Sequence, residues 1–154
     1  MTDRAITIEH LTPARLAETL EVLIPLYEAH YEPFIRTEIA KGAVPNDHQQ
    51  TTFIALVDGK VAGAVQILLN YVNTETYDLI WLSVGKNYQG LGLSKKLMDH
   101  AENYVAQMLL KGEPGTLMLA DFTRHQNPDS KFYLNLGYTE GPLMHDARRL
   151  CLRF

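Results

Sequence analysis

The sequence has a single cysteine, Cys151, so an internal disulfide is excluded. No apolar run approaches the roughly 18–20 residues that a membrane span requires, so we expect no membrane partner. Positive charge is not in excess, because 14 Lys and Arg stand against 18 Asp and Glu, a net charge of −4. Without a polybasic run, nucleic acid is not expected as a partner. The 6 histidines show no metal-ligand spacing, so we expect no metal.

What is present is the composition of an ordinary globular protein. The 154 residues are 46% hydrophobic and 21% charged, which excludes a disordered or collagenous chain and suits one domain spanning residues 1–154. The charged start Met1–Arg4 has no apolar signal segment behind it, so we expect a cytoplasmic location.

The N-terminal third predicts one strand and two helices. Residues 5–11 alternate apolar and polar side chains, as a half-buried strand does. A helix should begin at Thr12-Pro13, and Pro25 should kink or divide it. A short second helix is expected over residues 34–40.

A three-stranded meander should follow. The apolar runs 53–57 and 60–69 are separated by Asp58-Gly59, a strong signal for a tight hairpin because both central residues of its turn need positive φ. Residues 77–84 form the third strand.

The second half of the chain predicts a helix followed by shorter elements. Apolar residues recur at helical spacing from Leu93 to Met108, and Gly112 should end this helix. The strands on either side of it should be parallel, since a helical crossover joins them. The fold class is therefore α+β, with a mixed, mostly antiparallel sheet of about six to seven strands flanked by about four helices. The remaining elements are a strand over 116–122, a short helix over 127–137, and strands over 138–144 and 147–154.

A glycine-rich loop, Tyr88–Lys95, lies between a predicted strand and the long helix. Gly90 and Gly92 let consecutive backbone N–H groups converge at the helix N-terminus, where an anion such as a pyrophosphate is favoured. Lys95 and Lys96 could reach a further phosphate, or be ordinary surface residues. The loop lacks the Walker pattern, and an antiparallel meander is the wrong context for a dinucleotide fingerprint.

Two segments carry a resemblance to a known family. The run Gln89–Ser94 resembles the coenzyme A pyrophosphate loop, Gln/Arg-x-x-Gly-x-Gly/Ala, of the GNAT superfamily of N-acetyltransferases, with Ser94 departing from the usual Gly or Ala. The run Asn127–Tyr138 looks like the superfamily segment that contains Tyr-x-x-Leu-Gly-aromatic. In order and spacing the resemblance covers residues 5–154, and its specific part is confined to residues 78–105 and 116–138.

The resemblance implies an acyl-CoA N-acyltransferase-like fold and transfer of the acetyl group of acetyl-CoA to a primary amine of a small molecule or peptide, by direct attack on the thioester. Tyr133 would protonate the departing sulfur, with packing on the buried face of a short helix as its alternative role. The residues expected to bind the coenzyme are Leu82, Val84, Gln89, Gly90, Leu91, Gly92, Leu93, Ser94, Lys95 and Asn127.

A base is also needed, because a primary amine with a pKa near ~10 is mostly protonated at neutral pH. Asp78 is the candidate, and without a bulge it would share a strand face with Leu82 and Val84. A surface carboxylate is the alternative role for Asp78. Its rivals as the base are Glu75, Glu28, Glu32 and His125.

The acceptor amine is the least determined part. Tyr27, Glu28 and Tyr31 crowd the end of the first helical region, and aromatic rings with carboxylates would suit a cationic amine. The same residues would also make an ordinary amphipathic helix end.

Two other classes of function stay open, a non-catalytic acyl-CoA-binding sensor or regulatory domain and an interaction protein that has lost the coenzyme. A homodimer through the final hairpin is possible. The acceptor's identity and the acyl-chain preference do not follow from the sequence.

Overall fold

The protein is described here from a computed structural model, over residues 4–44, 50–69, 76–110, 117–122, 130–136, 139–144 and 147–153. Its strands are β1 (Ile6–His10), β2 (Gln50–Val57), β3 (Lys60–Leu69), β4 (Thr76–Val84), β5 (Leu117–Phe122), β6 (Thr139–Met144) and β7 (Ala147–Arg153). Its α-helices are α1 (Leu16–Leu23), α2 (Glu32–Lys41), α3 (Leu93–Leu110) and α4 (Ser130–Asn135), and its short 3₁₀ helices are η1 (Pro13–Arg15), η2 (Ile24–Leu26), η3 (Ala29–Tyr31) and η4 (Lys86–Tyr88).

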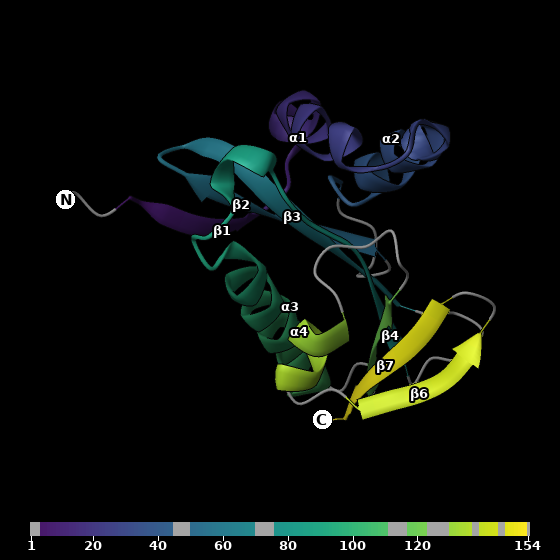
Figure 1. Cartoon of the computed structure of the whole chain (residues 1–154). Helices are drawn as coiled ribbons and strands as arrows, with labels where there is room; N and C mark the ends of the chain where they lie inside the picture. Colours follow the sequence, from purple (N-terminus) through teal and green to yellow (C-terminus); the bar gives the residue numbers. More distant parts are fainter. Residues whose placement is uncertain are drawn as a thin grey trace.

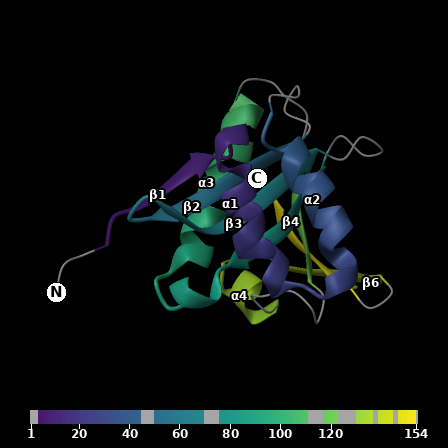
Figure 2. The same cartoon turned by 90° about the horizontal axis from the view of Figure 1, so that it is seen from above.

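The strands form one seven-stranded sheet in the order β1-β2-β3-β4-β5-β7-β6. Helices α1 and α2 cover one face, and α3 and α4 lie on the other (Figures 1 and 2). Strands β1 to β4 form an antiparallel meander, while β4 and β5 pair in parallel across the α3 crossover. The predicted α+β class and the parallel pair are confirmed. The place of β7 between β5 and β6 was not predicted.

Local signals in the first half of the chain are confirmed. Asp58 and Gly59 have φ values of 51° and 81°, as the turn of a tight hairpin requires. Pro25 lies in η2, which ends α1 as the proline predicts. Helix α2 spans Glu32–Lys41, slightly longer than expected.

Strands β2 to β4 are covered on both faces, and this gives two apolar clusters. The larger lies under α3 and contains Phe53, Leu97 and Met98, each at most 2% exposed. The smaller lies under α1 and α2 and contains Leu23, Ile35 and Ile39, all fully buried. Burying each such side chain contributes roughly 1.5–3 kcal/mol, so packing fixes both helix layers on the sheet.

One buried polar side chain ties α2 to the sheet. Gln66 in β3 is fully buried, and its amide nitrogen donates to the Glu38 carbonyl oxygen at 2.6 Å and to Thr52 Oγ1 at 3.0 Å. Its amide oxygen accepts from Gln50 Nε2 at 3.1 Å. Because a buried amide is costly unless its hydrogen bonds are made, this network fixes the position of α2 over β2 and β3.

Strand β4 contains a bulge that shapes the site. Ala64 pairs with Ser83 and Gln66 with Ile80, so Trp81 and Leu82 lie opposite the single residue Val65. Trp81 has a φ of 57°, a left-handed conformation that costs a bulky residue about 1–2 kcal/mol.

The bulge also exchanges the two faces of β4. Before it, Tyr77 and Leu79 belong to the cluster under α3; after it, Leu82 and Val84 do, while Trp81 packs against the cluster under α1 and α2. Asp78 therefore lies on the face opposite Leu82 and Val84. The shared face was expected only for a strand without a bulge, and β4 has one.

Strands β4 and β5 separate after a short paired section. Their register runs from Thr76 opposite Leu117 to Leu79 opposite Ala120 and goes no further, although β5 is described to Phe122. Within the described strands, residues 80–84 of β4 thus have no partner on the β5 side. Their outward backbone groups form a short internal edge at which an extended ligand can pair.

Among the described residues, no helix is both long and apolar enough to cross a bilayer.

Candidate active site

The turn after β4 is built by backbone hydrogen bonds. The Gly85 N–H donates to the Ala62 carbonyl at 2.7 Å, and the Tyr88 N–H donates to the Gly85 carbonyl at 2.9 Å, closing η4. Gln89 then folds back, with its amide nitrogen 3.4 Å from the Val84 carbonyl oxygen. These contacts hold the glycine loop at the end of β4.

The loop itself uses glycine where other residues are strained. Gly90 and Gly92 have φ values of 83° and 74°, which glycine adopts without the cost that a Cβ adds. The Lys96 N–H donates to the Gly92 carbonyl at 3.2 Å, so the first turn of α3 starts at Gly92. The preceding N–H groups, of Leu93, Ser94 and Lys95, have no partner inside the helix and are suited to an anion.

These groups border a cavity of about 220 Å³, which we call the loop cavity. Seven of the ten residues expected to bind the coenzyme line it. Leu82 and Leu91 instead pack in or against the cluster under α3, and Asn127 lies outside the described residues. The lining residues are Val84, Tyr88, Gln89, Gly90, Gly92, Leu93, Ser94, Lys95 and Phe132.

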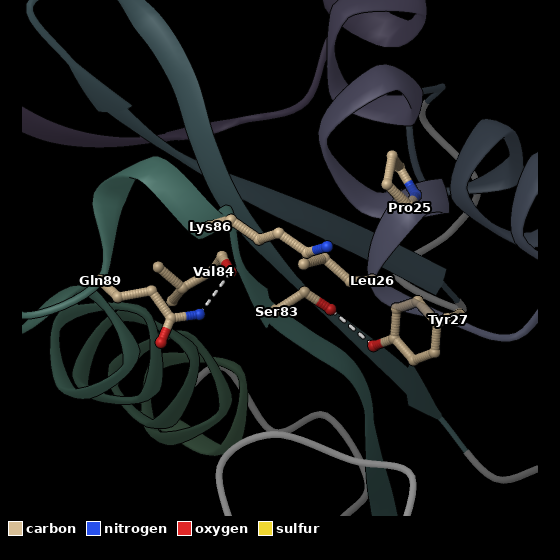
Figure 3. Close-up of a pocket in the computed structure, with 7 residues that line it drawn as sticks. All are labelled: Pro25, Leu26, Tyr27, Ser83, Val84, Lys86 and Gln89. Carbon is tan, nitrogen blue, oxygen red and sulfur yellow. Dashed lines mark hydrogen bonds between the residues drawn. The ribbon is translucent and has the colours of Figure 1, made fainter.

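A second cavity, of about 310 Å³, lies between the end of α1 and the end of β4 (Figure 3), and we call it the acceptor cavity. Val84 and Gln89 line both cavities, so the two meet at the end of β4. The lining residues of the acceptor cavity are Pro25, Leu26, Tyr27, Ser83, Val84, Lys86 and Gln89.

A hydrogen-bonded chain joins this cavity to the bulge. Ser83, 3% exposed, donates its single hydroxyl proton to the Trp81 carbonyl oxygen at 3.2 Å. The Tyr27 hydroxyl, 2.5 Å from Ser83 Oγ, must therefore be the donor in that contact (Figure 3). Burial raises the pKa of Tyr27, and the hydrogen bond with Ser83 opposes this in part. The phenol is therefore neutral near pH 7.

The predicted acceptor residues are separated by the structure. Tyr27 lines the acceptor cavity, while Tyr31 lies behind it in an edge-to-face cluster, 6.4 Å from the Tyr27 ring and 6.5 Å from the Trp81 ring. Glu28 is exposed and lies 3.4 Å from His30 Nδ1. It is not among the lining residues of either cavity.

The predicted catalytic residues are placed only in part. Tyr133 belongs to α4, beside Phe132 of the loop cavity, and its side chain is outside what the structure describes. Asp78 is partly buried on β4, opposite Leu68 of β3 and Leu119 of β5, and it lines neither cavity. Among its rivals, Glu32 is paired with Arg36 at 2.8 Å. Glu75 and His125 lie outside the described residues.

Two polar side chains that line the acceptor cavity, Ser83 and Lys86, were missed from the sequence. Ser83 stands in an apolar strand, where its polarity is the one signal that could have singled it out. Lys86 is the first residue after Gly85 and carries no motif. In the part of the chain that the structure describes, no group of three or more metal-ligating side chains is found.

The comparison with family models decides the relationship. The model of the acetyltransferase (GNAT) family matches residues 16–138. The chain belongs to this family. The match includes the β4 bulge, the glycine loop and α4, so the GNAT resemblance seen in the sequence is confirmed. No curated protein sequence is significantly similar to the chain.

Solved structures of GNAT proteins share the fold. A GNAT-family protein of Desulfovibrio desulfuricans has a TM-score of 0.78 at 19% identity, over 97% of this chain and 99% of that one. The PaiA N-acetyltransferase of Thermoplasma acidophilum, in complex with coenzyme A, gives 0.75 at 16%, over 97% and 99%. The ribosomal-protein-S18-alanine N-acetyltransferase of Escherichia coli gives 0.73 at 16%, over 97% and 94%. At these identities the likeness establishes the fold.

Proposed function

We propose that this GNAT protein transfers the acetyl group of acetyl-CoA to a primary amine of a small molecule or peptide. The observation that carries the proposal is the meeting of two cavities at Val84 and Gln89. One cavity presents backbone N–H groups to an anion, and the other opens toward α1. A thioester held at the junction would be open to attack from the acceptor cavity.

The backbone suggests how the coenzyme would lie. Its pyrophosphate would accept hydrogen bonds from the N–H groups between Gly90 and Lys95, favoured by the dipole of α3. Its pantetheine arm would pair with the internal edge of β4 that the separation from β5 leaves, as an added strand does. The complex of PaiA with coenzyme A shows that a protein of this fold can bind this ligand.

The chemistry is a direct acyl transfer. The amine nitrogen forms a bond to the acetyl carbon, the carbon–sulfur bond breaks, the nitrogen loses one proton and the sulfur gains one. The products are an N-acetylated amine and coenzyme A. The peptide N–H groups of the bulge at Trp81 and Leu82 are candidates to stabilise the oxyanion, because a bulge leaves backbone groups unpaired.

Two side chains are proposed for the proton steps. Tyr133 would supply the proton to the departing sulfur, as the resemblance of its segment to the GNAT motif implies, and it belongs to α4, the helix that brings Phe132 to the loop cavity. Asp78 lies on the α1 and α2 face of β4 but five residues before Ser83, about 16 Å at roughly 3.3 Å per residue. It would therefore act on the amine through a chain of several water molecules, because a single water spans only two hydrogen bonds.

The test is turnover with separate measurement of binding. Purified protein is titrated with acetyl-CoA by calorimetry, and thiol release is followed with a panel of amines. Tyr133→Phe should keep coenzyme affinity and lose roughly 10²–10⁴ in kcat, the usual worth of general acid catalysis. Tyr104→Phe is the matched control, because Tyr104 packs beside Phe53, away from both cavities.

The outcomes separate the alternatives. Binding with amine-dependent thiol release supports the enzyme. Binding without thiol release for any amine indicates an acyl-CoA sensor, and no binding indicates an interaction protein. An unchanged kcat in Tyr133→Phe would remove the role assigned to that tyrosine.

A further inference from the structure

The described residues that line the acceptor cavity carry charge of one sign. Of the lining residues that the structure describes, Lys86 is the only charged one, and no carboxylate accompanies it. Its side chain extends from η4, and its ammonium group points toward the Leu26 side of the cavity (Figure 3). Lys86 makes no ion pair with any described residue.

The two carboxylates that follow Tyr27 in the sequence are engaged elsewhere. Glu28 pairs with His30 at 3.4 Å and Glu32 with Arg36 at 2.8 Å, and neither lines the cavity. An acceptor that carried only ammonium groups would therefore meet one like charge and no opposite charge among the described lining groups. Like charges at short range repel, and more strongly in a half-enclosed site than in water.

The coenzyme does not account for Lys86. The charges of acetyl-CoA reside on its phosphates, whereas the pantetheine arm that would lead to the junction is neutral. The loop cavity, which suits the pyrophosphate, has its own lysine, Lys95, and Lys86 does not line it. Lys86 lies instead in the acceptor cavity, beyond the Val84 and Gln89 junction.

On the other side of the cavity, the direction of the hydrogen bond between Tyr27 and Ser83 indicates where the amine would bind. Tyr27 donates its proton to Ser83, whose own proton goes to the Trp81 carbonyl. The phenol oxygen of Tyr27 is therefore left as an acceptor, suited to an N–H of the amine. The cavity thus offers an acceptor for the amine and a cation for a second group on the same substrate.

We propose that the acceptor is an amine that also carries an anionic group, such as the carboxylate of an amino acid, and that Lys86 binds this group while Tyr27 accepts from the amine. The inference rests on the proposed function and names the substrate class of that same site. Ser83 is a positioning residue in this scheme, because it fixes the direction in which the Tyr27 hydroxyl points.

The experiment compares matched acceptors. Free amino acids, their carboxamides and 1,4-diaminobutane are each tested in two ways: by calorimetry on protein saturated with coenzyme A, and by thiol release with acetyl-CoA. We expect the carboxylates to bind, and to give kcat/KM values, about 10-fold or more above the carboxamides, as for one charge-assisted hydrogen bond. Lys86→Gln should bring this ratio near one with coenzyme A affinity unchanged.

Two further variants complete the design. Lys60→Gln changes an exposed lysine of the β2–β3 hairpin and should keep the ratio. Ser83→Ala should raise KM for the carboxylate acceptors while the ratio between carboxylates and carboxamides persists, because Lys86 is intact. A purely structural role of Ser83 would instead lower thermal stability and leave KM unchanged.

Several results would overturn the inference. Equal or better use of carboxamides or diamines by the wild type excludes it, as does a lack of discrimination in both readouts. A preference retained in Lys86→Gln, or a loss of coenzyme A affinity in that variant, assigns Lys86 another role. Binding that discriminates without any thiol release would leave the inference standing and reject the proposed acetyl transfer.

Discussion

Gly90 and Gly59 form a matched pair for testing the glycine loop. Their φ values are 83° and 81°, and a Cβ added at either would meet nothing within 4 Å. Alanine at either position therefore clashes with nothing, but it must hold a left-handed conformation that costs about 1–2 kcal/mol. In a chain of this length 1 kcal/mol corresponds to roughly 2–4 °C. We expect Gly90→Ala and Gly59→Ala each to lower the Tm by roughly 2–8 °C.

Coenzyme affinity should distinguish the two variants. Gly90 lines the loop cavity, whereas Gly59 lies in the turn of the β2–β3 hairpin. In Gly90→Ala, relaxation of the substituted residue toward negative φ would turn the following N–H away from a bound pyrophosphate. The loss of one hydrogen bond to a charged group costs about 1.5–3 kcal/mol, or roughly 10- to 150-fold in Kd. Calorimetric titration with coenzyme A should show this for Gly90→Ala and no change for Gly59→Ala.

Two outcomes would contradict this role of Gly90 in coenzyme binding. Equal weakening of coenzyme binding by both variants would mean that affinity follows global stability rather than loop geometry. A lower Tm for Gly90→Ala with an unchanged Kd would mean that the loop does not hold the pyrophosphate.

Three further predictions concern stability. Gly63→Ala should destabilise the protein by more than about 2 kcal/mol in urea unfolding, because its Cβ would lie 2.5 Å from the Ser83 carbonyl oxygen; a loss under about 0.5 kcal/mol would contradict this. Burial lowers the pKa of His100, so the unfolded chain takes up a proton first and stability falls as pH drops below about 6.5; His100→Asn should reduce that fall in urea unfolding. Burial raises the pKa of Tyr27, so the unfolded chain loses this proton first and the free energy of unfolding falls as pH rises above about 10. The difference in free energy of unfolding between wild type and Tyr27→Phe should therefore be smaller at pH 10.5 than at pH 8, which urea unfolding at the two pH values measures.

The parts of the fold that the sequence predicted are those governed by neighbouring residues. Asp58-Gly59 requires positive φ at both positions, and this determines the turn and the pairing beside it, Val57 with Lys60 and Leu56 with Val61. A bulge between Leu56 and Ala55 then shifts the register, which the turn does not predict. Helix α3 has an apolar stripe and a glycine start, so its position follows from spacing. The glycine loop was predicted for the same reason, since its conformation depends on Gly90 and Gly92 themselves.

The bulge in β4 could not be predicted in this way. Residues 79–82 are all apolar, and both faces of the strand are buried, so no alternation marks where the faces exchange. Asp78 was therefore expected to share a face with Leu82 only for a strand without a bulge. The insertion of β7 between β5 and β6 likewise depends on pairing between distant strands, which local patterns do not encode.

The residues that line the acceptor cavity could not be predicted from the sequence for a related reason. Tyr27 and Ser83 are 56 residues apart, and Lys86 comes from a turn with no recognisable pattern. A carboxylate close to Tyr27 in sequence, Glu28, suggested a cationic acceptor, but adjacent residues need not face the same cavity. The charge of the described lining residues therefore follows from the structure and not from neighbouring residues in the sequence.

Because β4 and β5 pair over a short section, the sheet has two parts, an N-terminal part (β1 to β4) and a C-terminal part (β5 to β7). Among the described residues, the meander of β1 to β4 pairs with the group of β5, β7 and β6 only over the section from Thr76 to Leu79 of β4. So short a pairing allows the C-terminal part of the sheet to unfold locally as a cooperative unit, at a lower free energy than global unfolding. Amide hydrogens in β5 and β7 should then exchange faster than those in β2 and β3. A coenzyme bound where β4 and β5 separate would contact both parts of the sheet, and amide hydrogen exchange in both parts should then become slower.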